Sequence, residues 1–319
     1  MTMPRSFLVT VPATTANIGP GFDCLGAALS RYNRFYFSDL SPHEAEKTPF
    51  LLEAVGIGAE QVTGETDNLL YQSFLQVYRH MGQEPPAVKV KIEMEVPLAR
   101  GLGSSATAIV GGIVGANAFG GFGLDDETLL RLAIDQEGHP DNVVPAFLGG
   151  CQLTIALGDT QPAPFPWTIC EIPWHDEIVP VIAIPNFELS TAKARKVLPL
   201  QYDRADAIFN MAHLGLLLRA LEIGNRDWLR SALNDRIHQP YRKFLIPGFD
   251  ELEAAAIGAG AYGLVISGAG PTLLALTDTR HQEPVAQALT QTWEALGIKS
   301  EVTALPLARS GTQVQPLDL

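Results

Sequence analysis

PLARGLGSSAT (residues 97–107) is a glycine-rich turn with two adjacent serines, and it lies between a strand pattern and a helix pattern. Before it, VKVKIEME (88–95) alternates apolar and charged residues, which is typical of a strand with one solvent-exposed face. After it, small residues from Ser105 onward favour a helix. The first N–H groups of such a helix have no intrahelical acceptor, and glycines allow close approach of an anion. This order predicts a phosphate site that needs no lysine.

Hydropathy alone would make part of this stretch a membrane-spanning helix. Gly101 to Leu124 contains no charged residue and is long enough to cross a bilayer. Its eight glycines, two serines and one asparagine make a poor lipid-facing surface. The composition therefore favours a helix that packs tightly inside a globular domain.

The turn also matches the G-x-G-x-x-A pattern of dinucleotide-binding proteins, with Asp125 about twenty residues further on. The first strand of that fold is buried on both faces, whereas every second residue from Lys89 to Glu95 is charged. No second strand is predicted between the helix and Asp125. A Walker A loop is excluded, because no Gly-Lys-Ser/Thr follows the glycines. A glycine turn that binds nothing remains the structural alternative.

GLGSSA resembles the phosphate loop of the small-molecule kinases that include the galactose, homoserine, mevalonate and phosphomevalonate kinases. Two other loops resemble the first and third motifs of that superfamily, in the right order: VPATTANIGPGFDCLGAAL (11–29) and VISGAGPTLLAL (265–276). Three further runs resemble the homoserine kinases within it: EGHPDNVVPAFLGG (137–150), STAKARKVLP (190–199) and NDRIHQPYRKFLIPGF (234–249). The resemblance spans essentially the whole chain.

The resemblance implies an α+β, two-domain small-molecule kinase fold. Residues 1–165 would form a nucleotide-binding domain resembling ribosomal protein S5 domain 2, and residues 166–319 a ferredoxin-like α/β sandwich. The implied activity is ATP-dependent phosphorylation of the side-chain hydroxyl of L-homoserine in threonine biosynthesis, with Mg²⁺ as the metal. A kinase of the superfamily that acts on another small alcohol is the second interpretation. A relative that binds ligand without turnover is the third, and the intact Ser105, Glu137 and glycine loops argue against it.

Glu137 is expected at the C-terminal end of a helix that begins near Asp126. The macrodipole disfavours a carboxylate there by about a few tenths of a kcal/mol. By resemblance, the compensating partner is Mg²⁺, shared with the Ser105 hydroxyl and with nucleotide oxygens. A solvated surface glutamate is the alternative.

The resemblance assigns the acceptor site to three loops. His139 and Asn142 would line the point where the acceptor hydroxyl meets the γ-phosphate, although Pro-Asp-Asn is also ordinary turn chemistry. Related sugar and mevalonate kinases usually carry an aspartate as base where this sequence has Asn142, and Asp141 is expected to turn away. Asn17 and Asp23 would hold the acceptor's hydroxyl and ammonium ends, unless they only form a turn.

Arg195 and Arg242 are the candidates for binding a carboxylate, because guanidinium offers a planar fork of donors. The expected site residues are, for catalysis, Asn17, Glu137, His139 and Asn142; for ATP, Asn68, Pro97, Leu98, Ala99, Arg100, Gly101, Leu102, Gly103, Ser104, Ser105, Ala106 and Thr107; for the acceptor, Asn17, Asp23, His139, Thr191, Arg195, Arg242, Gly268 and Gly270; and for the metal, Ser105 and Glu137. Asn68 has an equally good structural explanation as a helix N-cap.

Composition limits the classes of partner. A length of 319 residues suggests about two domains, and a formal net charge of -13 argues against nucleic acid or an anionic membrane. The three cysteines have no CxxC spacing, so neither a disulfide framework nor a zinc site is predicted. No signal-peptide pattern precedes the first strand, and a cytoplasmic location is expected. A homodimer is compatible with the sequence, which does not determine the oligomeric state.

Periodicity and turn residues give a coarse element map. Strands are expected at 7–11, 29–37, 88–94, 152–157, 178–184, 262–277 (a pair) and 301–305, and helices at 67–81, 105–119, 126–136, 204–220, 227–233, 249–257 and 283–296. Residues 158–180, rich in proline and tryptophan, are the candidate crossover between domains.

Overall fold

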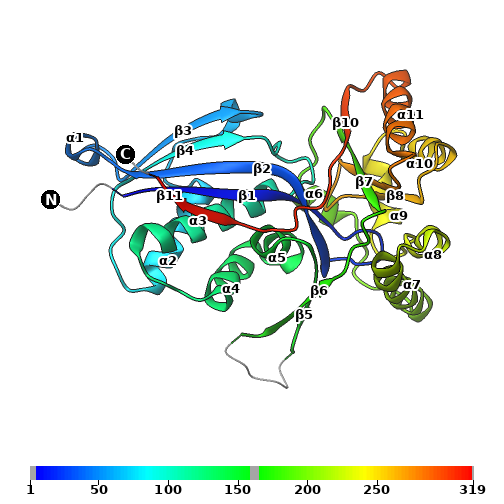
Figure 1. The fold of residues 1–319 in the computed structure, drawn as a ribbon, viewed down its shortest axis with the longest axis horizontal. Helices are drawn as coiled ribbons and strands as arrows, with labels where there is room; N and C mark the ends of the chain where they lie inside the picture. The colour runs from blue at the N-terminus through cyan, green and yellow to red at the C-terminus, as the bar shows by residue number, and fades with distance from the viewer. Residues whose placement is uncertain (1–4, 159–164, 318–319) are drawn as a thin grey trace.

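Two β-sheets, one in each lobe, organise the computed structural model, which describes residues 5–158 and 165–317 (Figure 1). The first sheet has the strand order β11-β1-β2-β4-β3, with β5 beside β2 and β6 beside β5. Its strands are β1 (Ser6–Ala16), β2 (Leu25–Asp39), β3 (Phe50–Gly56), β4 (Val88–Met94), β5 (Cys151–Ala156), β6 (Trp167–Ile172) and β11 (Gln313–Pro316). Of these described strands, β3 and β4 pair in parallel and the other neighbours pair antiparallel. In β4 the apolar positions are buried and the charged ones point outward, as its alternation predicts.

Helices cover one face of this sheet (Figure 1). They are α2 (Leu69–His80), α3 (Ser104–Gly120), α4 (Asp126–Glu137) and α5 (Pro140–Leu148), while the short α1 (Pro42–Ala45) follows β2. The glycines of α3 allow it to lie very close to its neighbours: a Cβ at Gly115 would come within 2.3 Å of the Phe37 ring, and one at Gly112 within 2.3 Å of the Leu70 carbonyl oxygen. The uncharged helix is therefore a core helix. No helix in the described part of the chain is long and apolar enough to cross a membrane.

The second sheet is antiparallel, with the order β10-β7-β9-β8. Its strands are β7 (Val179–Pro185), β8 (Gly263–Ile266), β9 (Leu273–Thr277) and β10 (Ser300–Ala304). The helices of this lobe are α6 (Thr191–Lys196), α7 (Arg204–Ile223), α8 (Arg226–Ala232), α9 (Gln239–Arg242), α10 (Phe249–Gly258) and α11 (Gln282–Ala295). The succession of strand, helices, two strands, helix and strand is the ferredoxin-like arrangement that the resemblance implies.

Several elements were not predicted from the sequence. They are β3, β6, β11, α1, α5, α6 and α9, and the predicted crossover at 158–180 contains β6 in place of an irregular connection. Residues 159–164 of that crossover lie outside the described residues. Both β6 and β11 belong to the first sheet although they follow residue 165. The division into domains at residue 165 stays a prediction about folding units, and sheet membership does not follow it.

The two lobes meet where three loops touch. These are the β1–β2 loop (17–24), the glycine turn before α3 (99–103) and the β8–β9 loop (267–272). Ser267 Oγ donates a hydrogen bond of 2.6 Å to the Gly101 carbonyl oxygen and lies 2.9 Å from Thr15 Oγ1. The Gly268 N–H donates to the Ala16 carbonyl oxygen at 3.0 Å. We call this three-loop contact the loop junction.

Gly101 tests the loop junction directly, because its φ is +81° and a Cβ there would lie 2.4 Å from the Ser267 carbonyl oxygen. Replacing Gly101→Ala should lower the free energy of unfolding by about 1–3 kcal/mol more than Gly123→Ala. Gly123 has a φ of +64°, but a Cβ added there would have nothing within 4 Å, so it carries the backbone cost without the clash. Urea unfolding measures both variants. Equal losses would contradict the close approach.

Candidate active site

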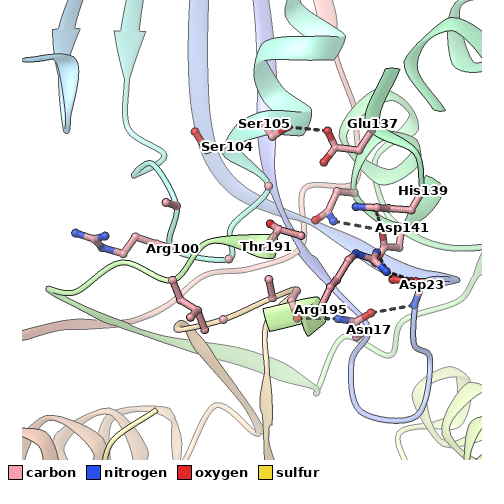
Figure 2. A pocket seen from close by; sticks show the side chains of 18 of the residues that line it. Asn17, Asp23, Arg100, Ser104, Ser105, Glu137, His139, Asp141, Thr191 and Arg195 are labelled. Atoms are coloured by element: carbon pink, nitrogen blue, oxygen red, sulfur yellow. Dashed lines mark hydrogen bonds and ion pairs between the residues drawn. The ribbon is translucent and has the colours of Figure 1, made fainter. Parts of the chain in front are cut away.

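A cavity lies at the loop junction, between the N-terminal ends of α3, α5 and α6 (Figure 2). Residues from both lobes line it. Its polar side chains are Asn17, Asp23, Arg100, Ser104, Ser105, Glu137, His139, Asp141, Asn142, Thr191, Arg195 and Arg242, with backbone from Gly101, Gly103, Gly268 and Gly270. The structure thus brings together every residue that the resemblance assigned to catalysis, metal or acceptor.

The N-terminus of α3 is open toward this cavity. Its N-cap is Gly103, with φ of +67° and no side-chain cap hydrogen bond, so the first N–H groups of the helix are not capped by a side chain. A Cβ at Gly103 would lie 2.0 Å from Thr14 Oγ1, which explains why the turn needs glycine here. A 17-residue helix that presents its N-terminal amides to a cavity is a ready site for a phosphate group.

A second groove lies on the other side of the same helix end. Half of its lining residues are apolar, including Leu98 and Ile92, and it shares Ser104, Ser105 and Thr191 with the first cavity. Asn68 also lines it. The two spaces meet over the first turn of α3, an arrangement that suits a nucleotide base on one side and a phosphate acceptor on the other.

Both polar ends of the Asn68 side chain are used within the protein. Its Oδ1 accepts from the Leu70 N–H at 3.0 Å, and its Nδ2 donates to the Thr63 carbonyl oxygen at 2.8 Å. Asn68 is therefore the N-cap of α2 and shapes the groove wall, which agrees with the structural explanation weighed from the sequence.

Ser105 and Glu137 form the oxygen-rich part of the cavity. Ser105 Oγ donates to Glu137 Oε2 at 2.6 Å, and Glu137 is the last residue of α4, as predicted. Burial raises the pKa of Glu137 above that of an ordinary glutamate, against the opposing effect of the Ser105 hydrogen bond. Among the described residues, no group of three His, Cys, Asp or Glu side chains could hold a metal ion. One carboxylate and one hydroxyl still fit a hard cation that takes its remaining oxygens from a nucleotide.

The start of α5 carries a chain of hydrogen bonds into the cavity. His139 Nδ1 lies 2.6 Å from Asp141 Oδ1, Asn142 Nδ2 donates to the same oxygen at 3.3 Å, and Thr14 Oγ1 donates to Asn142 Oδ1 at 2.9 Å. The expectation that Asp141 turns away is wrong, because its buried carboxylate lines the cavity and orients the His139 ring. No local pattern indicated this role, because Pro-Asp-Asn is also ordinary turn chemistry.

The pKa of His139 reflects two opposing effects. Burial lowers it, but the hydrogen bond and the negative charge of Asp141, together with the charge of Glu137, raise it above the ordinary value for histidine. The imidazole therefore keeps its proton to a higher pH than a free histidine does. The nitrogen that Asp141 does not hold is the one available to a ligand.

Asp23 and Arg195 pair with each other across the cavity (Figure 2). Arg195 donates from Nη1 to Asp23 Oδ2 at 2.9 Å and from Nη2 to Oδ1 at 2.8 Å, a bidentate contact that is partly exposed. Asn17 supports this loop, since its Oδ1 accepts from the Asp23 N–H and its Nδ2 donates to the Gly268 carbonyl oxygen. The two groups expected to bind opposite ends of an acceptor thus hold one another in this structure.

Arg242 is buried at 2% exposure and has no carboxylate partner within 4 Å in the described chain. It donates from Nε to the Ala194 carbonyl oxygen at 3.2 Å and from Nη1 to that of Gly268 at 3.0 Å, and its guanidinium lies 5.1 Å from the centre of the Phe22 ring. A buried cation without a counter-ion is costly. An anionic ligand in this cavity would compensate it.

One further residue, His238, supports the site and was not assigned a role from the sequence. His238 is fully buried, stacks on Phe22 with ring centres 5.2 Å apart, and its Nε2 is 2.9 Å from the Gly19 carbonyl oxygen. Burial lowers the pKa of His238, which favours the neutral ring. Arg100, which was expected in the phosphate loop, lines the cavity, and its guanidinium pairs with Glu188 at 3.2 Å. Only the resemblance of 234–249 to known kinases pointed toward His238.

Asp141→Asn should lower the pKa of His139, because the charge that opposes the burial effect is removed. NMR titration of the imidazole measures the shift. The matched control is Asp278→Asn, which removes the carboxylate 2.8 Å from His281 Nδ1 and should leave the titration of His139 unchanged. An unchanged His139 pKa in Asp141→Asn would contradict the pairing.

Comparisons with known proteins agree with this geometry. Residues 68–150 match the family described as GHMP kinases N terminal domain, and residues 217–295 match GHMP kinases C terminal. The chain is 56% identical over 313 residues to homoserine kinases of Trichormus variabilis and of Nostoc punctiforme, covering 98% of this chain and 99% of each relative. The crystal structure of homoserine kinase from Cytophaga hutchinsonii superposes with a TM-score of 0.84 at 28% identity, covering 99% of both chains. The chain belongs to the homoserine kinase family of the GHMP kinases.

Proposed function

We propose that this enzyme transfers the γ-phosphoryl group of ATP to the side-chain hydroxyl of L-homoserine, giving O-phospho-L-homoserine for threonine biosynthesis. One observation supports the choice of acceptor: a carboxylate, Asp23, and two guanidinium groups, Arg195 and Arg242, line the same cavity beside the α3 N-terminus. A free amino acid carries an ammonium and a carboxylate that need such partners. The relatives of nearly full-length similarity are named homoserine kinases.

Catalysis in this proposal depends on positioning and charge. The first-turn amides of α3 bind the phosphates, and the acceptor lies against Asn17, His139 and Asn142, where its hydroxyl faces the γ-phosphorus. A loose phosphoryl-transfer transition state needs little covalent help, so holding both reactants in line supplies most of the rate enhancement. The loop junction keeps the two binding surfaces at a fixed separation.

Incubation with ATP, Mg²⁺ and L-homoserine, followed by ³¹P NMR, tests the proposed activity. We expect a phosphomonoester signal that grows in step with ADP. Phosphorylation of another small alcohol, such as mevalonate, but not of homoserine would support the second candidate. ATP left unconsumed with every alcohol would support a relative that binds without turnover.

We infer that Ser105 and Glu137 hold Mg²⁺ together with nucleotide oxygens. Ser105 Oγ and Glu137 Oε2 lie 2.6 Å apart at the N-terminal end of α3, and oxygen ligands are the kind that Mg²⁺ prefers. When bound, the metal would neutralise charge on the phosphate oxygens. Because burial raises the pKa of Glu137, its carboxyl takes up a proton at a higher pH than an ordinary glutamate does. Affinity for Mg²⁺·ATP should therefore weaken on acidification sooner than an ordinary carboxylate would allow.

Glu137→Gln should cost about 3 kcal/mol or more in transition-state stabilisation, the scale of a lost preorganised charge contact. It should also remove the part of the acid-side loss of Mg²⁺·ATP binding that the Glu137 carboxyl causes, measured by calorimetry without acceptor. Glu188→Gln, which alters a carboxylate that pairs with Arg100 and Gln61, is the control. Normal turnover with an unchanged Mg²⁺ requirement in Glu137→Gln would exclude Glu137 as a ligand.

The Asp23–Arg195 ion pair must open for a zwitterionic acceptor, with the ammonium going to Asp23 and the carboxylate to Arg195 and Arg242. An acceptor with only one of these charges would open the pair and leave the other partner uncompensated. We expect the amino diol that lacks the carboxylate and the hydroxy acid that lacks the ammonium to lose about 10²–10⁴-fold in kcat/KM, as expected for a site with an unpaired polar group.

Alanine at Arg195 or Arg242 should erode the preference for homoserine over the amino diol, and Asp23→Asn should erode the preference over the hydroxy acid. Lys193→Ala changes an exposed neighbour on α6 and should leave both preferences intact. If the arginine variants keep the full preference for homoserine over the amino diol, the arginines do not bind the carboxylate.

We infer that no enzyme carboxylate removes the proton of the acceptor hydroxyl. Asn142 cannot act as a base near neutral pH, and Asp141 is held by His139 and Asn142. The proton would pass to the transferred phosphoryl group or to water as the bond to ADP breaks. His139, oriented by Asp141, is the one group that could still take it.

A profile of kcat against pH in wild type and His139→Gln decides between these routes. We expect wild type to show no acidic limb, meaning no fall in kcat as the pH drops, that disappears with the histidine, and we expect Asn142→Asp not to raise kcat. A limb above the ordinary histidine pKa, lost in His139→Gln, would establish His139 as the base, since the raised pKa of His139 places its titration there.

The proposal also includes a cytoplasmic location. Cys24, Cys151 and Cys170 are all free thiols in the structure, which suits a reducing compartment. ATP and a free amino acid as substrates fit the same compartment. Fractionation of the source cells would test this location.

A further inference from the structure

His238 is a fully buried histidine at the N-cap of α9, the short helix that carries Arg242. It is not among the residues that line the active-site cavity, so its ring does not face a ligand bound there. The ring nevertheless contacts the loop that carries Asp23. Because burying a polar ring is costly unless it is hydrogen-bonded, these contacts indicate its role.

Hydrogen bonds fix the position of His238 in the second lobe. The buried Asp235 carboxylate accepts from the His238 N–H at 2.8 Å and from the Gln239 N–H at 2.7 Å. The Gln239 side chain in turn accepts from the Ile266 N–H of β8 at 2.9 Å. The His238 carbonyl oxygen accepts from the Arg242 N–H at 3.0 Å. His238 and Arg242 therefore belong to one hydrogen-bonded turn that is held against the second sheet.

The imidazole of His238 reaches across to the β1–β2 loop of the first lobe. Its Nε2 lies 2.9 Å from the Gly19 carbonyl oxygen, while the Asp235 carboxylate is 3.7 Å from the same nitrogen. A carbonyl oxygen can only accept, so Nε2 carries the proton. Nδ1 has no hydrogen-bond partner among the described residues, and a charged ring would bury a second N–H there with nothing to accept it. The neutral ring with its proton on Nε2 fits this place.

The same imidazole stacks on Phe22, with ring centres 5.2 Å apart and an interplanar angle of 23°. The guanidinium carbon of Arg242 lies 5.1 Å from the centre of the Phe22 ring, and that of Arg195 lies 5.8 Å from it. The negative face of an aromatic ring attracts such cations. Phe22 directly precedes Asp23, so one ring joins His238, both arginines and the loop expected to bind an ammonium group.

We propose that His238 is a positioning residue for the phosphoryl acceptor. It holds the loop that carries Asp23 at a fixed separation from Arg242, through its hydrogen bond to the loop and the aromatic stack. The inference rests on the proposed function, in which these two groups bind opposite ends of one amino acid. A change in their separation would lower the affinity for the acceptor, because a small amino acid spans a limited distance. His238 does not line the nucleotide groove, so nucleotide binding should not change.

The loop needs this anchor when the acceptor binds. Its start is held by Asn17, whose Nδ2 donates to the Gly268 carbonyl oxygen at 2.8 Å. Its end is held by the Asp23–Arg195 ion pair, but that pair opens in the proposed complex. The side chain of His238 contacts no acceptor, so it can hold the loop after the pair has opened.

Steady-state kinetics of His238→Asn and His238→Gln test the proposal. The amide nitrogen of glutamine can take the place of Nε2 and donate to Gly19, whereas asparagine is one carbon shorter and places its amide near Nδ1. We expect His238→Asn to raise KM for homoserine about tenfold, the size of one lost hydrogen bond in a buried place, and His238→Gln to raise it less. KM for ATP should be unchanged in both variants.

Trp293→Phe is the matched control. It also removes a buried ring N–H, which donates to the Pro247 carbonyl oxygen at 3.2 Å, and Trp293 does not line the active-site cavity. It should leave KM for homoserine unchanged, and circular dichroism checks that each variant is folded. An unchanged KM for homoserine in His238→Asn, or an equal rise in KM for ATP and homoserine, would overturn the proposal.

Phe22→Leu tests the same anchor if neither His238 variant folds, because Phe22 is the partly exposed member of the stack. KM for homoserine should rise several-fold when the aromatic face is lost, and an unchanged value would overturn the proposal.

Nitrogen-15 NMR of the His238 ring separates this proposal from the proposed function, since it needs no substrate. We expect the ring proton on Nε2, and a proton on Nδ1 would overturn the proposal whatever the acceptor is. A wild type that phosphorylates another alcohol and not homoserine would overturn the proposed function alone. KM for that alcohol in the same variants would then decide whether His238 positions the acceptor.

Discussion

The hydrogen bond from Ser267 Oγ to the Gly101 carbonyl oxygen joins the two lobes at the point where the loops of the site meet. Gly101 belongs to the turn before α3, whose N-terminal end is the proposed phosphate site, and Ser267 begins the loop whose Gly268 carbonyl oxygen accepts from Asn17 and Arg242. The backbones approach so closely that a Cβ at Gly101 would clash. Reactants bound on the two lobes are thereby held at one separation, which is what phosphoryl transfer by positioning requires.

The charged groups of the cavity complement a zwitterionic amino acid that lies beside the phosphates of a nucleotide, which is the arrangement that the proposed function requires. In the proposed function, the open α3 N-terminus supplies partial positive charge for phosphates, Glu137 and Ser105 supply oxygens, and the Asp23–Arg195 pair supplies one partner for each end of an amino acid. The ion pair keeps both groups satisfied before a ligand arrives. This explains how a protein with a formal net charge of -13 accommodates a nucleotide: the positive groups are local and oriented.

The sequence predicted what is local and missed what depends on distant pairing. The glycine turn, the start of α3 and the end of α4 at Glu137 follow from residues close together in the chain, and the three-motif resemblance brought the correct loops to one site. The strand β11 was missed because QVQP is short, exposed and paired with β1, about three hundred residues away. The helix α5 was not predicted because Pro-Asp-Asn is also ordinary turn chemistry, although proline at the first helical position is a helix signal. The Asp23–Arg195 contact joins residues 172 positions apart, and no local pattern indicates it.

A crystal structure with a non-hydrolysable ATP analogue and L-homoserine would show whether both reactants are held in line at the loop junction. We predict the γ-phosphate on the first-turn amides of α3, the acceptor hydroxyl in line with it, and the Asp23–Arg195 pair opened around the amino acid. An amino acid bound elsewhere, or a closed Asp23–Arg195 pair beside bound homoserine, would contradict it.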